Sequence, residues 1–360
     1  MEYRFLGKTG LRVAELGMGC MTLENGFDEN LGHRMLDRYV DAGGNLLDVA
    51  DNYPGAEEAV GRWIKSRGQR SQYVLQSKVR FPVGSGPNDV GLTRKHILDG
   101  VENSLRKLQT DYLDVYQSHC WDFVTPIEET LRVFDDLVSA GKVRYIGASN
   151  FTGWQITKAV AVSDANRWVR YASLQSQYSL LCRFPEWEII PACLEAGVSV
   201  TAWSPLASGW LTGKYKKDAL PPRGSRLAEA VETEEDWANI LSVGVNATVP
   251  HPHKLKQEEV YQKKVNEIES DRRWRIIEAV GDVAQKHGKT CSQIALAWIL
   301  NRPEKITPII GATKMEQLED NLGAAGIRLA DDEMEWLNQI SDPGNPYPLD
   351  FFKQYGIPWR

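Results

Sequence analysis

The chain has 360 residues, 42% of them hydrophobic and 25% charged, which is ordinary globular composition. Its formal net charge of −6 argues against a nucleic-acid partner, because binding a phosphate backbone needs a basic surface. The sequence has no apolar run long enough to span a membrane and no secretory signal, so we expect no membrane partner. Five scattered cysteines without a Cys-x-x-Cys pair indicate a reducing compartment. We therefore expect a cytoplasmic protein.

The first predicted element is a hairpin over residues 3–13, where Gly7-Lys8-Thr9-Gly10 separates two apolar stretches. After it, short β-branched runs alternate with longer stretches of helical periodicity, which is typical of parallel strands joined by helices. The eight predicted strands cover residues 15–19, 46–50, 73–77, 113–118, 145–148, 173–175, 198–202 and 306–310. Helical patterns cover residues 33–42, 94–108, 127–140, 193–196, 274–287 and 292–300. This pattern predicts an α/β protein, a (β/α)₈ TIM barrel whose floor is plugged by the N-terminal hairpin.

Two segments fall outside this repeat. Residues 215–272 form a long insertion between the seventh and eighth predicted strands, with helical patterns at 232–241 and 257–270. Connections of that length usually form a lid or a binding element, so we expect a lid-like insertion. The C-terminal tail, residues 343–360, is rich in proline and aromatic residues and is expected to lie over the barrel mouth. We expect residues 1–360 to form a single barrel domain.

Polar side chains follow the predicted strands at the ends where a barrel of this kind places its active site. Asp48 and Tyr53 follow the second strand, Lys78 the third and His119 the fourth. Each residue also has a structural interpretation, as a turn cap, a packed ring, a solvated amine or a core histidine. Chance rarely places four such groups at equivalent strand ends, and their conjunction favours a shared site.

The chemistry that needs this set is delivery of a proton to a carbonyl oxygen. A free tyrosine has a pKa of about 10, which is high for an acid working near neutral pH. An ammonium about 4 Å away would lower that pKa by at most about three units, so we expect Lys78 to lower the pKa of Tyr53. Asp48 would keep Lys78 charged, and His119 would orient the carbonyl oxygen.

These segments resemble the aldo-keto reductase superfamily over nearly the whole chain. The segments with its catalytic residues match residues 46–53, residues 75–78, which end in Lys78, and residues 111–119. The resemblance implies hydride transfer from NAD(P)H to an aldehyde or ketone. It makes Tyr53 the proton donor, supported by Lys78 and Asp48, with His119 orienting the substrate.

The resemblance also implies a cofactor site. The nicotinamide end would contact Gly19, Cys20, Met21, Ser149, Asn150, Gln175, Trp203, Ser204, Pro205 and Leu206. A loop with Ser208, Gly209 and Leu211 would close over the pyrophosphate, and the adenosine end would contact Gly311, Ala312, Thr313, Lys314, Gln317 and Asn321. Many members place an arginine beside the 2′-phosphate, whereas here Lys314 is the one cation evident in that stretch. The resemblance favours NADP(H) and leaves NAD(H) as an alternative.

Other motifs do not support a different site. No Gly-x-Gly-x-x-Gly opens a helix after a strand, and residues 209–215 fail the Walker A spacing. His251 and His253 lack a third ligand nearby, so we expect no metal. Trp121, which follows His119 and Cys120, is the strongest candidate for contacting a small carbonyl or alcohol substrate.

Two other functions remain open from the sequence. One is a non-catalytic or slow nucleotide-sensing subunit, because the superfamily includes barrels that resemble channel β subunits. The other is a cofactor-free lyase or isomerase on the same fold.

Overall fold

The computed structural model describes residues 1–23, 26–217, 219, 222, 225 and 259–354. These residues divide into two compact units. The first unit contains Met1–Gln177, Glu188–Trp203 and Arg302–Gly326, and the second contains Tyr178–Trp187, Ser204–Asn301 and Ile327–Arg360. The first unit holds every strand of the barrel.

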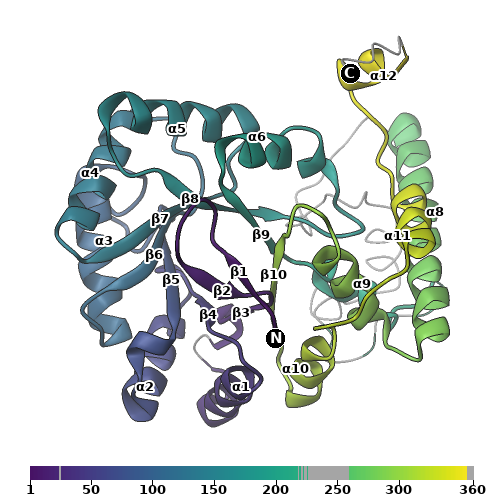
Figure 1. The fold of residues 1–360 in the computed structure, drawn as a ribbon, viewed down its shortest axis with the longest axis horizontal. Helices are drawn as coiled ribbons and strands as arrows, with labels where there is room; N and C mark the ends of the chain where they lie inside the picture. The colour runs from purple at the N-terminus through teal and green to yellow at the C-terminus, as the bar shows by residue number, and fades with distance from the viewer. Residues whose placement is uncertain (24–25, 218, 220–221, 223–224, 226–258, 355–360) are drawn as a thin grey trace. The chain divides into compact units, whose positions relative to one another are not determined.

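Eight parallel strands close into a barrel in the first unit, and β10 pairs with both β9 and β3 (Figure 1). The strands are β3 (Gly17–Gly19), β4 (Leu46–Asp48), β5 (Val74–Val79), β6 (Leu113–Ser118), β7 (Val143–Ser149), β8 (Tyr171–Gln177), β9 (Ser199–Trp203) and β10 (Thr307–Ile310). The predicted (β/α)₈ barrel is confirmed. The bounds of β6 coincide with the predicted ones, and the other strands differ from prediction at one or both ends.

Helices follow the strands of this unit along the chain. They are α1 (Glu29–Asp41), α2 (Ala56–Arg67), α3 (Arg94–Leu108), α4 (Ile127–Ser139), α5 (Gly153–Asn166), α6 (Ile189–Ala196) and α10 (Met315–Leu322), with short turns η1 (Met21–Leu23) and η2 (Arg70–Gln72). Side chains begin several of them: Asp28 accepts from two backbone amides of α1, and Thr93 accepts from the amide of His96 in α3. The sequence patterns missed α2, α5 and α10.

The hairpin formed by β1 (Tyr3–Phe5) and β2 (Arg12–Ala14) is antiparallel, as predicted. In Figure 1 it lies across one end of the barrel. Leu6 and Val13 are buried in one cluster with residues near the beginnings of the strands, among them Leu46 and Val74. The hairpin therefore closes the barrel floor, which leaves the carboxyl ends of the strands for a site.

The second unit contains η3 (Phe184–Glu186), η4 (Ala207–Thr212), α8 (Glu259–His287), α9 (Cys291–Leu300), α11 (Asp331–Ile340) and α12 (Leu349–Gln354). Two separate helices were predicted at residues 257–270 and 274–287. The break between them was predicted wrongly, because a single continuous helix, α8, runs from Glu259 to His287. The pattern at 232–241 lies outside the described residues. The lid role of residues 215–272, the place of the tail over the barrel mouth and the single-domain organisation stay predictions.

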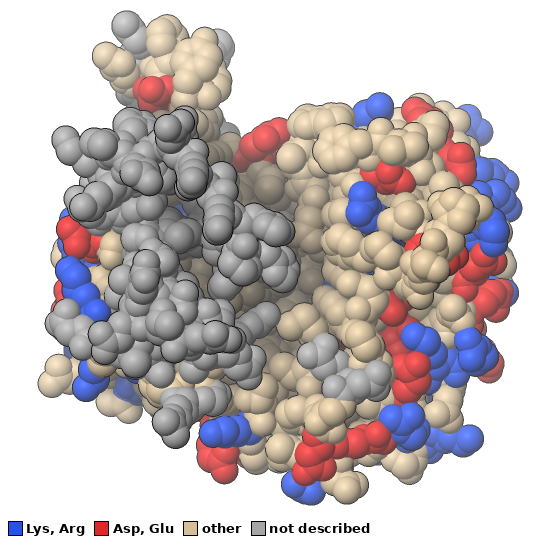
Figure 2. Space-filling model, turned by 180° about the vertical axis from the view of Figure 1, so that it is seen from behind, with Lys and Arg blue, Asp and Glu red and all other residues tan. Residues whose placement is uncertain are grey.

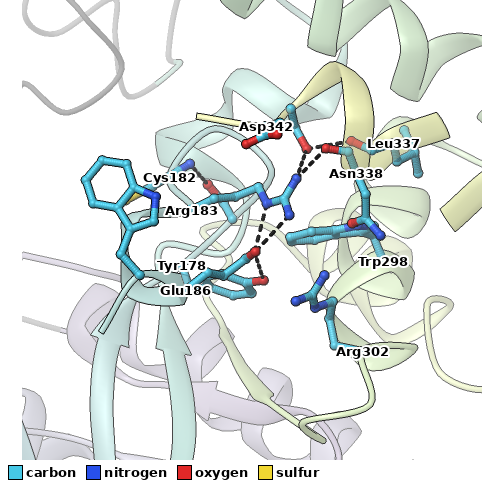
Figure 3. A network of polar contacts seen from close by, with 12 residues as sticks. Tyr178, Cys182, Arg183, Glu186, Trp298, Arg302, Leu337, Asn338 and Asp342 are labelled. Carbon is cyan, nitrogen blue, oxygen red and sulfur yellow. Dashed lines mark hydrogen bonds and ion pairs between the residues drawn. The ribbon is translucent and has the colours of Figure 1, made fainter. Parts of the chain in front are cut away.

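A buried arginine organises the second unit (Figure 3). The guanidinium of Arg183 donates two hydrogen bonds of 2.8 Å to the carboxylate of Glu186. It also donates to the carbonyl of Asn338 at 2.6 Å and to the hydroxyl of Ser341 at 2.9 Å. Its charged carbon lies 5.4 Å from the ring centre of Trp298. One side chain thus connects η3, α9 and the end of α11.

The surface shown in Figure 2 carries lysine and arginine interspersed with aspartate and glutamate over the coloured residues. This mixture is typical of a solvated globular surface. Within the part of the chain that the structure describes, no helix combines the length and the apolar character needed to cross a membrane.

Replacing Arg183 with alanine is expected to lower the free energy of unfolding by about 3 to 5 kcal/mol, because the variant loses the buried guanidinium and its hydrogen bonds to Glu186, Asn338 and Ser341. Urea unfolding followed by circular dichroism measures this. The control is Arg132→Ala, whose partner Asp136 forms an exposed pair, and it should cost less than about 1 kcal/mol. Equal losses in both variants would contradict the role assigned to Arg183.

Candidate active site

Strand alternation inside the barrel brings the predicted catalytic groups together. Asp48 ends β4, and Lys78 lies near the end of β5. Gln76 and Lys78 are two residues apart on β5, so their side chains share a face of the sheet. Both contact Asp48, which fixes that face as the one toward the site. His119 follows the last residue of β6 directly, and its amide donates to the carbonyl of Val79.

The centre of the site is an ion pair. The ammonium of Lys78 lies 2.8 Å from Oδ1 of Asp48 and donates to the carbonyl of Val49 at 2.8 Å. The Lys78 side chain is fully buried, and that of Asp48 is 6% exposed. The side-chain amides of Gln76 and Gln175 also donate to Oδ1 of Asp48. Three donors thus converge on one carboxylate oxygen, which offsets much of the cost of burying it.

The electrostatics of Lys78 follow from these contacts. Burial lowers its pKa, but the charge of Asp48 and the nearby Tyr53 more than offset burial, so the pKa lies above the ordinary value. Lys78 is therefore an ammonium at neutral pH, as the sequence predicted.

Tyr53 lies next to this ammonium. The amine nitrogen of Lys78 is 5.2 Å from the centre of the Tyr53 ring, and the ring is half-buried. Burial raises the pKa of Tyr53, Lys78 lowers it and Asp48 raises it, and the net pKa is above the ordinary value. Lys78 does lower the pKa of Tyr53, as expected, but burial raises it by more. The prediction that the pKa would lie below its ordinary value was therefore wrong. Tyr53 therefore carries its proton at neutral pH.

The ring of His119 lies in the same site, against the ring of Tyr53. Its ring meets the ring of Tyr53 edge-on, with 5.9 Å between centroids, and that of Phe81 at 4.6 Å. Burial, together with the charges of Lys78 and Arg80, lowers the pKa of His119 to about 2. The imidazole is neutral across the working pH range, and Nδ1 has no hydrogen-bond partner among the described residues. A neutral ring can donate one hydrogen bond to a substrate oxygen.

Hydrogen bonds of Asn150 connect the ends of β7 and β9 with His119. Asn150 adopts a left-handed backbone with φ of 54°. Its amide donates to the carbonyl of His119 and to the hydroxyl of Ser149, both at 3.0 Å. Its oxygen accepts from the indole N–H of Trp203 at 3.0 Å. These bonds hold the partly exposed Trp203 ring in one orientation at the rim.

The barrel strand β3 and the residues after it bring three further predicted residues to the end of the barrel where the site lies. Gly19 ends β3, and the amide of Cys20 donates to the carbonyl of Asp48 at 2.8 Å. Burial raises the pKa of the Cys20 thiol, and Asp48 adds to this, so Cys20 stays protonated. Met21 begins η1 and is 36% exposed.

The predicted adenosine site is a loop at the start of α10. The side chain of Gln317 accepts from the amide of Thr313 at 2.8 Å and from its hydroxyl at 3.1 Å. Asn321 donates to the carbonyl of Gly311 at 3.2 Å. Lys314 precedes the helix and is exposed, and two residues before it the carbonyl of Ala312 accepts from the hydroxyl of Thr22. Helix α10 thus holds its own N-terminal loop.

The remaining predicted cofactor residues belong to the second unit. Ser204, Ser208 and Gly209 have left-handed backbones, with φ of 51°, 55° and 92°. The amide of Leu211 donates to the carbonyl of Leu206 at 3.3 Å, which closes the turn that follows Pro205. The role of this turn over a pyrophosphate stays a prediction.

Trp121, the predicted substrate residue, is largely buried in an aromatic cluster. Its ring lies edge-on to Phe151 at 5.1 Å and to Trp154 at 5.3 Å. Its contact with a substrate stays a prediction. His251 and His253 lie outside the described residues, and the residues that are described contain no cluster that could hold a metal ion.

Sequence reasoning missed three residues of the site: Gln76, Arg80 and Phe81. Gln76 could have been predicted, because it stands two residues before Lys78 along a strand, and side chains two residues apart lie on the same face. Arg80 and Phe81 follow the strand in an irregular segment, where no periodicity indicates direction.

Comparison with known proteins identifies the class. The sequence profile of the Aldo/keto reductase family matches residues 15–342. An uncharacterized oxidoreductase of Bacillus subtilis, YrpG, is 35% identical, over 97% of this chain and 98% of its own length. A probable voltage-gated potassium channel subunit beta of Arabidopsis thaliana is 35% identical over 91% and 92%. Versiconal hemiacetal acetate reductase of Aspergillus parasiticus is 30% identical over 97% and 99%. The chain belongs to the aldo-keto reductase family.

Asp48→Asn is expected to lower the free energy of unfolding by about 3 to 5 kcal/mol at pH 7, because it leaves the buried Lys78 ammonium without an anion. In the variant, burial then depresses the pKa of Lys78 below its unfolded value, so the folded state binds fewer protons. The stability gap between variant and wild type should therefore narrow as the pH rises from 7 toward 10. Urea unfolding at several pH values measures the gap, and a constant gap would contradict this account.

Proposed function

We propose that the chain reduces the carbonyl group of an aldehyde or ketone, with Tyr53 as the proton donor. A nicotinamide cofactor, when bound, supplies the hydride. The observation that carries the proposal is the fully buried Lys78 ammonium, which is paired with Asp48 and lies beside the Tyr53 ring. Burying a charged pair costs stability, which favours a functional role for it, and the ammonium stabilises the phenolate that forms when Tyr53 gives up its proton.

Each residue has a role that follows from its contacts. Tyr53 holds a proton at its phenol oxygen and gives it to the carbonyl oxygen. Lys78 stabilises the phenolate that results, and Asp48 keeps Lys78 charged. His119 is neutral, so it can donate a hydrogen bond to the same oxygen without adding charge. The rings of Phe81 and Tyr53, which both lie edge-on to the imidazole, restrict its orientation.

The residues at the rim fit a nicotinamide cofactor. Trp203 offers an aromatic face whose orientation is fixed by Asn150, and Ser149 and Gln175 provide polar groups near the ends of β7 and β8. The loop before α10 suits an adenosine phosphate, because backbone amides at a helix start favour anions. We propose NADP(H) as the cofactor on the strength of Lys314, with NAD(H) as the alternative. Five cysteines without a disulfide support a cytoplasmic location.

A second candidate function is nucleotide sensing without rapid turnover. Relatives named as probable potassium channel beta subunits favour it, since they match at 34–35% identity over 91% of the chain. Titration with NADPH and NADH, followed by tryptophan fluorescence, tests cofactor binding, and a panel of aldehydes then tests turnover. Binding with turnover supports the reductase. Binding without turnover supports the sensor. No binding of either nucleotide contradicts both and leaves a cofactor-free barrel enzyme.

Tyr53→Phe removes the transferable proton and keeps the ring. Reduction should fall by at least about 100-fold, the size of a general-acid contribution, while NADPH binding stays close to wild type. Steady-state kinetics and fluorescence titration measure the two effects. Turnover at the wild-type rate in this variant would remove Tyr53 as the acid.

Lys314→Ala should weaken NADPH binding by about tenfold and leave NADH binding nearly unchanged, because only the former carries a 2′-phosphate. Lys158→Ala, an exposed lysine of α5, is the control and should alter neither affinity. An equal loss for both nucleotides in Lys314→Ala would exclude this lysine from the phosphate site.

A further inference from the structure

A second polar cluster lies on the opposite face of β5 from Lys78. Ser77, the neighbour of Lys78, donates from its hydroxyl to Oε1 of Glu57 on α2 at 2.7 Å. Tyr116 on β6 is the register partner of Ser77, so its side chain shares that outer face. Asp51, in the turn between β4 and Tyr53, belongs to the same cluster. These groups occupy the layer between the barrel and its helices.

Asp51 is nearly fully buried, and neither of its carboxylate oxygens has a side-chain hydrogen-bond partner among the described residues. The hydroxyl of Tyr116 is also buried without one. Gly100 on α3 permits this arrangement, because a Cβ there would lie 3.0 Å from the Tyr116 oxygen and 3.9 Å from Oδ2 of Asp51. Structural acids in protein cores are normally hydrogen-bonded, so packing alone does not explain Asp51.

A cavity of about 390 Å³ reaches Asp51. Its wall also includes the charged residues Glu57, Arg106 and Lys107 and the apolar residues Pro82 and Val83. A cavity of this size admits water, so solvent comes close to the buried carboxyl group of Asp51.

Asp51 is coupled to the catalytic pair on the other face of the strand. Burial and the negative charge of Glu57 raise the pKa of Asp51 to about 8, against the backbone amide of Asn52 and the charges of Lys107 and Lys78. In turn, the charge of Asp51 raises the pKa of Tyr53. The backbone connects them too, since the Asp51 amide donates to the carbonyl of Lys78 at 3.2 Å.

We propose that Asp51 is a positioning residue that responds to solvent pH through this cavity and controls how firmly the Tyr53–Lys78 pair retains its proton. The inference rests on the proposed function, because it gives Asp51 a part in the same proton transfer. At neutral pH Asp51 is uncharged. Above pH 8 it ionises, and its negative charge holds the proton on Tyr53 and the charge on Lys78. Ionised Asp51 thereby extends reduction to more alkaline pH.

The test is the pH profile of Asp51→Asn, which stays uncharged at every pH. The variant lacks the charge that holds the proton on Tyr53, so the alkaline limb of kcat should move to lower pH by about half a unit to one unit. The pH at which kcat falls to half of its plateau value should therefore be lower in the variant by the same amount. An unchanged midpoint would overturn the proposal.

A second measurement does not depend on turnover. The near-ultraviolet absorbance of phenolate is followed against pH, and the signal of the Tyr53→Phe protein is subtracted to isolate Tyr53. Its titration should move to lower pH in Asp51→Asn. If no carbonyl is reduced but this shift occurs, the proposed function fails while the coupling of Asp51 to Tyr53 stands. If wild type turns over and the shift is absent, only the Asp51 inference fails.

Glu57→Gln is the matched control, because it alters a carboxylate of the same cluster that lies on α2 and accepts from Ser77, outside the turn that carries Asp51 and Tyr53. It should leave the titration of Tyr53 at the wild-type position, since Asp51 is ionised at alkaline pH in both proteins. A shift in Glu57→Gln as large as that in Asp51→Asn would mean that disturbing the cluster moves Tyr53, and it would overturn the role of the Asp51 charge.

Discussion

The buried ion pair between Lys78 and Asp48 is the constraint on which the site depends. An ammonium that is fully buried keeps its proton only beside an anion, and Asp48 is 2.8 Å away. That carboxylate in turn needs the amides of Gln76 and Gln175, which come from β5 and β8. Strands β4, β5 and β8 must therefore keep their register, because a shift of one residue would turn these side chains out of the barrel.

The same alternation explains why two polar clusters lie close together without merging. Lys78 points to the site and Ser77 to the helices, and each holds one carboxylate, Asp48 or Glu57. The turn after β4 serves both clusters. It places Asp51 on the outer side and Tyr53 on the inner side, so the backbone limits the distance between the phenol of Tyr53 and the carboxyl group of Asp51, whose charge raises the pKa of Tyr53.

Much of this fold follows from local sequence patterns, and parts of the site do too. The eight strands, the hairpin and α3 were predicted because their periodicity is strong, and the strand ends then indicated Lys78 and His119. The burial of Asp51 could not be predicted, because it depends on α3 approaching at Gly100, nearly fifty residues further along the chain. Arg183 was missed for a similar reason, since its partners beyond η3 lie near the end of α11.

The sign of the pKa shift of Tyr53 shows what sequence reasoning lacks. From residue types alone the ammonium of Lys78 dominates, and the pKa falls. In the folded chain, burial of the phenol acts in the opposite direction and is the larger effect. The proton on Tyr53 is therefore held by a difference between two large opposing contributions, and each further charge near the pair shifts that balance noticeably. For this reason a carboxyl group outside the barrel lining, such as Asp51, can shift the pKa of Tyr53.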